Sequence, residues 1–114
     1  MAYDLALANR VRAYLAEVPG IDIQEKEMFG TLNFMVNGKT CVCVLGHKLM
    51  LRFDPAVQES LYDRKGYETM YMKGKPYRGY CYMHPEGFEL PTDFAFCIDL
   101  CLAYNPSAKA SKRR

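Results

Sequence analysis

Apolar residues recur every three or four positions near the start of the chain, which is the spacing of one face of an α-helix. Asp4 is of a residue type that caps helix N-termini, and the pair Pro19-Gly20 stops helices. We therefore expect a first helix between these two signals. Its apolar stripe consists of Leu5, Ala8, Val11, Leu15 and Val18.

The pattern then changes to the alternation of strands. It predicts four consecutive strands, at residues 21–29, 31–36, 40–45 and 49–53. An irregularity near Glu25 interrupts the first of them. Asn37-Gly38 separates two of the runs, and this dipeptide indicates a hairpin because both residues tolerate positive φ. Gly30 and Gly46-His47-Lys48 mark the other tight turns, so the strands should form an antiparallel meander.

The second half of the chain predicts two more helices and two more strands. Asp54-Pro55 fits an N-cap followed by the first helical residue, so a short helix should run to Arg64. The strands are expected at residues 67–72 and 79–83. A last helix should begin at Pro91 and end at Asn105-Pro106. Its buried stripe is Phe94, Cys97, Ile98, Cys101 and Leu102.

These elements follow one another in the order α-β-β-β-(β)-α-β-β-α. Strands joined by tight turns favour an antiparallel sheet with helices packed on it, which is the α+β class in two layers. The 114 residues suffice for one domain with a substantial core. We expect this domain to cover residues 1–105 and residues 106–114 to form a disordered basic tail.

The charge of the chain is unevenly distributed. The sequence has 15 basic and 13 acidic residues, and four of the basic ones lie in the last six positions. The rest of the chain is therefore slightly acidic, which is unusual for a nucleic-acid binder. The sequence has neither an apolar run of transmembrane length nor a basic start followed by an apolar segment. We expect a cytoplasmic protein that does not contact membranes.

The five cysteines are an odd number without a secretory context, so we expect free thiols. Cys41 and Cys43 should share one face of a strand, and Cys97 and Cys101 one face of a helix. Two such pairs could hold zinc, but Cys-x-Cys within a strand is poor geometry for chelation. Core packing is the interpretation we favour, with no metal and no cofactor.

Two groups of residues are candidates for an interaction surface. The first is Lys26, Met28, Phe29 and Gly30; the alternative, which we favour, is that Met28 and Phe29 fill the core and Gly30 serves a turn. Arg52 lies within a strand and could bind an anion, or it could pair with Glu25 or Glu27 on the surface.

The second group lies in residues 65–82, where five tyrosines alternate with lysines and arginines. Tyr77, Arg78 and Tyr80 are its central members. Aromatic and basic side chains on a sheet can stack bases and hold phosphates, and the same types are enriched in protein interfaces. Plain packing of a half-buried sheet remains a third interpretation. His47 and His84 have no Ser or Cys nearby in a catalytic motif, so we expect no enzyme.

Several segments together resemble the N-terminal domain of the TfoX/Sxy family. They are Met1 to Asp4, Leu7 to Arg12, Lys26 to Gly30, Phe34 to Gly38, Gly74 to Tyr80, and Pro85 to Gly87. The resemblance covers about residues 1–105. It implies a fold similar to that of secretion chaperones and a bacterial cytosolic protein. The named members are regulators of competence for DNA uptake, and they carry a second, helical domain after this one. The resemblance supplies no catalytic residues.

We therefore expect a small cytosolic, non-enzymatic interaction or regulatory module of the single-domain type. A protein partner is expected, and the module could pair with itself as a homodimer. The alternative is a nucleic-acid-associated protein that uses the segment 65–82 and the basic tail.

Overall fold

A computed structural model describes residues 2–109 of the chain. It has two α-helices, α1 (Leu5–Ala16) and α2 (Pro91–Tyr104). Three short 3₁₀ segments are η1 (Pro55–Leu61), η2 (Pro85–Gly87) and η3 (Asn105–Ser107). The strands are β1 (Ile23–Met28), β2 (Thr31–Val36), β3 (Lys39–Leu45), β4 (Lys48–Arg52), β5 (Tyr67–Met72) and β6 (Lys75–Met83).

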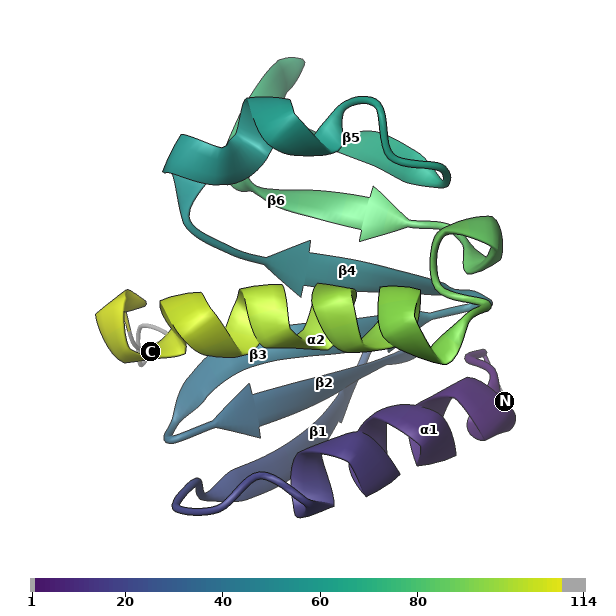
Figure 1. Cartoon of the computed structure of the whole chain (residues 1–114), viewed down its shortest axis with the longest axis vertical. Coiled ribbons are helices and arrows are strands. Elements are labelled where there is room, and N and C mark those ends of the chain that lie inside the picture. Colours follow the sequence, from purple (N-terminus) through teal and green to yellow (C-terminus); the bar gives the residue numbers. More distant parts are fainter. Residues whose placement is uncertain (1, 110–114) are drawn as a thin grey trace.

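The six strands form one antiparallel sheet in the order β1-β2-β3-β4-β6-β5. α1 and α2 both lie on the same face of this sheet, with α1 over β1 and β2 and α2 across the centre (Figure 1). The described part of the chain starts beside the N-terminal end of α1 and ends beside the C-terminal end of α2. The predicted two-layer α+β class is confirmed.

The capping and turn signals gave the right local structure. The Asp4 carboxylate accepts hydrogen bonds from the backbone N–H groups of Ala6 and Leu7, at 2.9 and 3.1 Å. Asn37 and Gly38 have φ values of 52° and 81°, as a two-residue hairpin turn with positive φ at both positions requires. The Asp54 carboxylate likewise caps η1 through the N–H of Ala56.

Some boundaries and orientations differ from the prediction. α1 ends at Ala16, and Leu5 lies exposed while Leu7 is buried in its place. The expected irregularity near Glu25 is absent from the β1–β2 register, and the shift occurs between Phe34 and Met35 on the β3 side of β2. The short helix after Asp54 is a 3₁₀ segment that ends at Leu61 instead of Arg64.

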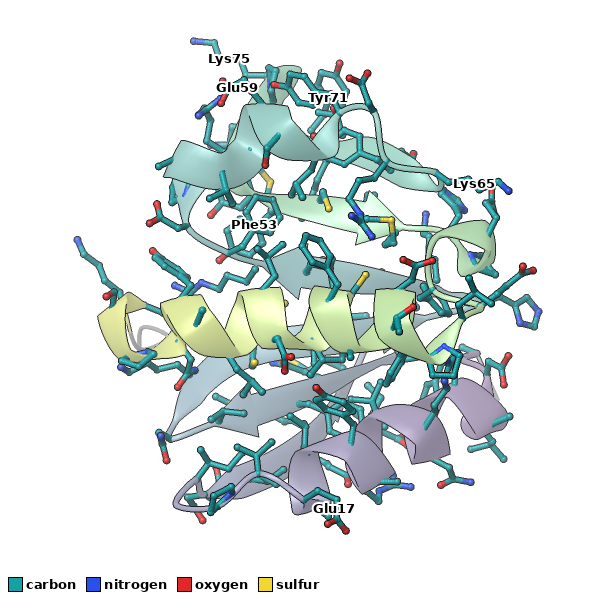
Figure 2. All side chains as sticks on the ribbon, in the orientation of Figure 1. Glu17, Phe53, Glu59, Lys65, Tyr71 and Lys75 are labelled. Atoms are coloured by element: carbon teal, nitrogen blue, oxygen red, sulfur yellow. The ribbon has the colours of Figure 1, made fainter. Side chains whose placement is uncertain are left out.

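The core lies between the sheet and the two helices. Two rows of paired residues point toward the helices, and their inner members are Leu32, Val44, Leu49 and Met83 in one row and Phe34, Val42, Leu51 and Cys81 in the other. Val11 and Leu15 of α1 and Ile98 of α2 complete the cluster. Phe53 is fully buried, and Figure 2 shows it in the space beside α2.

All five cysteines are buried as free thiols, as expected. Cys41 belongs to the core cluster together with Cys97 and Cys101. Cys43 does not belong to this cluster, because its side chain lies on the opposite face of the sheet. There its thiol donates to Asn33 Oδ1 at 3.4 Å. The register shift in β2–β3 thus separates two residues that were expected to share a face.

The segment after α2 still contacts the sheet. Asn105 Nδ2 donates to the carbonyl of Val36 at 3.0 Å, and Ala108 is buried. The guanidinium of Arg52 donates to the carbonyl of Lys109 at 3.1 Å. Residues 106–109 of the expected tail therefore make defined contacts, and residues 110–114 lie outside the described residues. Within residues 2–109, no helix has the length and apolar character needed to cross a membrane.

Candidate interaction surface

The face of the sheet opposite the helices is uncovered in the part of the chain that the structure describes (Figure 1). We call it the open face. Strand pairing identifies its residues, because paired residues point to the same side and successive residues alternate. The central row of the open face lies between the two core-facing rows and consists of Lys26, Asn33, Cys43, Met50, Tyr82 and Glu68.

This central row has an uncharged middle and charged ends. Asn33 and Cys43 are buried, with only 9% and 4% of their surface exposed, although no helix covers them. Met50 and Tyr82 beside them are half-buried. The exposed Lys26 and Glu68 lie on the two edge strands, β1 and β5. Depletion of charge at the centre and a polar rim are typical of protein-binding surfaces.

The β1–β2 turn extends the open face at one corner. Phe29 is 100% exposed and Met28 is 47% exposed, so the interpretation that these two residues fill the core is wrong. Phe29 has φ 52° and Gly30 has φ 76°, which confirms the turn role of Gly30. A Cβ atom at Gly30 would lie 2.8 Å from the Cβ of Ala2, so the N-terminal segment packs closely against this turn. The tyrosine hydroxyl of Tyr3 donates to Glu27 and braces it further.

The basic and aromatic candidates cluster on the neighbouring strands β4 and β6, away from the β1–β2 turn. The rings of Tyr77 and Tyr80 stack, with centroids 4.5 Å apart and planes 3° from parallel. The guanidinium of Arg52 lies 5.7 Å from the Tyr80 ring and donates to the carbonyl of Thr40 at 3.3 Å. Arg52 thus pairs with neither Glu25 nor Glu27, contrary to that expectation.

Arg78 is held within the domain. Its guanidinium donates to Glu59 Oε2 and to the carbonyl of Pro55, both at 2.8 Å. The hydrogen bond from Arg78 lowers the pKa of the Glu59 carboxyl below its ordinary value. Arg78 therefore ties β6 to η1, and it is the sequence-predicted candidate with the clearest structural role.

Among the remaining titratable groups are buried thiols and two histidines that contact carboxylates. Burial raises the pKa of Cys43 and of Cys81 to about 12, and that of Cys97 to about 11, so these thiols stay protonated at neutral pH. His47 Nδ1 lies 3.0 Å from Asp4 Oδ2, and His84 Nε2 lies 2.6 Å from Glu68 Oε1. Among residues 2–109, no group of three or more His, Cys, Asp or Glu could hold a metal ion.

Most of the centre of the open face was not among the residues predicted from the sequence. Tyr82 belongs to the candidate segment 65–82, whereas Asn33, Cys43 and Met50 were not candidates for an interaction surface, because each lies between two apolar core residues. The signal that could have identified them is the alternation of strand residues between the two faces. Asn33, Cys43, Met50 and Tyr82 occupy the positions between core residues on four strands, yet none of them is charged. Charged residues would be typical of a face exposed to water.

Comparison with known proteins adds a family assignment for the scaffold that presents this surface. The family model described as TfoX N-terminal domain matches residues 13–104. The match begins within α1 and ends at the last residue of α2, so it includes all six strands. No curated protein and no solved structure matches the chain.

Proposed function

The chain belongs to the TfoX N-terminal domain family, and on that premise we propose that it is a non-enzymatic module that binds proteins through the open face of its sheet. The observation that carries the proposal is that no helix of residues 2–109 covers the middle of this face, although its central row carries no charged side chain between Lys26 and Glu68. Soluble sheets of this kind usually place charged residues on a solvated face. Here the middle of the face is Asn33, Cys43, Met50 and Tyr82.

The proposal includes a regulatory role in the bacterial cytosol, as the family resemblance implies. A regulator of this size acts by holding partners, and the site chemistry is consistent with that. The cysteine thiols with raised pKa are poor nucleophiles, and each histidine contacts a carboxylate. The exposed Phe29 turn adds an aromatic anchor at the corner of the same surface.

The test is a comparison of partner recovery with two lysine substitutions. Met50→Lys places a charge in the centre of the open face, where the flexible side chain can still reach water. Glu17→Lys is the matched control, because Glu17 lies at the far end of α1, away from that face (Figure 2). Affinity purification from the host cell with quantitative mass spectrometry should show proteins that depend on Met50 and not on Glu17.

The proposal fails if Met50→Lys, shown to be folded by circular dichroism, retains the same proteins as the wild type. A charge in the centre of a desolvated contact typically costs well over 1 kcal/mol, so at least a tenfold loss in recovery is expected.

A second function, the binding of single-stranded nucleic acid, is favoured by one cluster. The stacked pair Tyr77–Tyr80 lies next to Arg52, whose hydrogen bonds in residues 2–109 go to neutral carbonyl groups. Stacked aromatics beside an arginine suit bases and phosphates. Fluorescence anisotropy with a labelled oligonucleotide at low salt tests it: affinity should fall steeply with salt and be lost in Arg52→Ala. Salt-independent or absent binding would exclude this function.

A further inference from the structure

We propose that the partner of the open face is a second copy of this chain, packed face to face about a two-fold axis parallel to the strands. The inference rests on the proposed function, since it names the occupant of the same surface. It is argued from the order of residues across the sheet, from the shape of a twisted sheet, and from the size of the face.

The central row reads as a self-complementary sequence of side chains. From β1 to β5 it is Lys26, Asn33, Cys43, Met50, Tyr82, Glu68. An axis parallel to the strands, between β3 and β4, reverses this order in the partner. Lys26 then faces the partner's Glu68, Asn33 faces the partner's Tyr82, and Cys43 faces the partner's Met50. Each contact occurs twice, and each pairs groups that suit one another.

The charges at the ends of the row support this pairing. Within residues 2–109, Lys26 is in none of the ion pairs, which involve other residues. Glu68 contacts Lys48 at 3.7 Å and His84 at 2.6 Å, yet 48% of its side chain is exposed. A carboxylate has about four lone-pair sites, so Glu68 can accept a further cation. A like-facing arrangement, β1 on β1, would instead put Lys26 against Lys26.

A twisted sheet keeps contact along its whole width in this geometry. The twist gives the sheet the shape of a saddle. A half-turn about an axis parallel to the central strands maps such a saddle onto a parallel copy of itself. The two faces therefore stay at about the 10 Å spacing of packed sheets from the centre to the edge strands. Long Lys and Glu side chains can span that spacing at the ends of the row.

The face is close to the size that a specific dimer needs. Six strands at about 4.8 Å spacing and about 20 Å long give a footprint of roughly 480 Å² per copy. Two copies therefore approach the ~1,000 Å² that separates a biological interface from a casual contact. Phe29 and Met28 at the corner add exposed apolar surface to this area.

The experiment is sedimentation velocity over a concentration series with the full chain and two charge reversals. In the Lys26→Glu variant, two acidic side chains oppose each other at each end of the row. In the Glu68→Lys variant, two basic side chains do so. Each variant alone should dissociate at least tenfold more readily than the wild type. Mixed in equal amounts, they should form a heterodimer of near wild-type affinity, because both end pairs are then of opposite charge. Lys65→Glu, outside the row, is the matched control and should dimerise normally.

A wild-type chain that stays monomeric at all concentrations overturns the inference, and so does a mixture that fails to associate although both variants are folded. Glu68→Lys also meets Lys48 and His84 within its own chain, so its thermal unfolding is measured first. If it does not fold, Met50→Lys takes its place and must abolish the dimer. If the wild type is monomeric but Met50→Lys still recovers fewer partner proteins, only the dimer is refuted. If Met50→Lys recovers the same proteins as the wild type, the proposed function is refuted as well.

Discussion

At the scale of single residues, Phe29 occupies a backbone conformation that suits Asn or Gly. Within residues 2–109, three two-residue turns have positive φ at both positions: Phe29-Gly30, Asn37-Gly38 and Lys73-Gly74. A bulky residue in this region costs on the order of 1 kcal/mol. Phe29 is fully exposed, so packing against the described residues 2–109 does not offset this cost. The proposed binding surface would account for an aromatic residue at this position.

Replacement of Phe29 by Asn should therefore separate stability from binding. We expect Phe29→Asn to raise the free energy of unfolding by about 0.5–1 kcal/mol, because Asn is favoured at this turn position. Partner recovery should fall at the same time. Urea unfolding and affinity purification measure the two effects.

Lys73→Asn, in the equivalent position of the β5–β6 turn, is the control. It should stabilise the fold to a similar degree and leave partner recovery unchanged. A Phe29→Asn variant that is less stable than the wild type would contradict the argument from backbone conformation.

The buried thiols make a second prediction at this scale. Because burial raises the pKa of Cys43, Cys81, Cys97 and Cys101, the native protein should react with a thiol reagent at pH 8 only as fast as it unfolds. All five cysteines should react at once in guanidinium. Rapid labelling of a thiol in the folded protein would show a reactive cysteine and reopen the enzymatic interpretation.

At the scale of elements, η2 depends on a glycine packed between two neighbours. A Cβ at Gly87 would collide with the carbonyl of Lys65 and lie 2.6 Å from the sulfur of Met83. Gly87→Ala should lower the free energy of unfolding by about 2 kcal/mol through overpacking. The neighbouring Glu86→Ala should change it by less than about 0.5 kcal/mol. Equal effects of the two changes in urea titrations would contradict this packing.

The link between α1 and β1 makes a prediction about pH. Arg12 donates to both carboxylate oxygens of Glu25, at 2.5 and 2.6 Å, and this bond lowers the pKa of Glu25. A lowered folded-state pKa contributes stability above the ordinary pKa of a glutamate, and this stability is lost as pH falls through the folded-state value.

Glu25→Gln should accordingly be less stable than the wild type at pH 7, by at most about 1 kcal/mol because the pair is partly exposed. The difference should shrink as the pH falls below about 4. Thermal unfolding from pH 7 to pH 3 measures it, with Glu17→Gln as the exposed control. A difference that stays constant across this range would argue against the ion pair.

Turns and caps were predictable at this scale because their residues act locally. Asp4, Asn37-Gly38 and Asp54 fix the backbone within a few positions, whatever the rest of the chain does. The register shift between Phe34 and Met35 was not predictable, because it depends on how two strands pair across a turn. The same pairing separates Cys41 from Cys43.

At the scale of the whole molecule, the sequence showed which residues are apolar but not which side of the sheet the helices cover. The tyrosines of β6 and the Phe29 turn were recognised as candidates, whereas Asn33, Cys43 and Met50 were not. Their common row exists only in the assembled sheet, since its six members come from six strands. The resemblance to the family agreed with the fold and left the surface to be found in three dimensions.

The most direct test of the open face is methionine oxidation footprinting of the chain in extract of its own cells and as dilute purified protein. Met50 is half-buried on the open face, and Met72 is exposed at the end of β5. If the open face is a binding surface, Met50 should oxidise much more slowly in the extract, while Met72 keeps its rate. Equal oxidation of Met50 in both samples would show that nothing covers this face and would contradict the account.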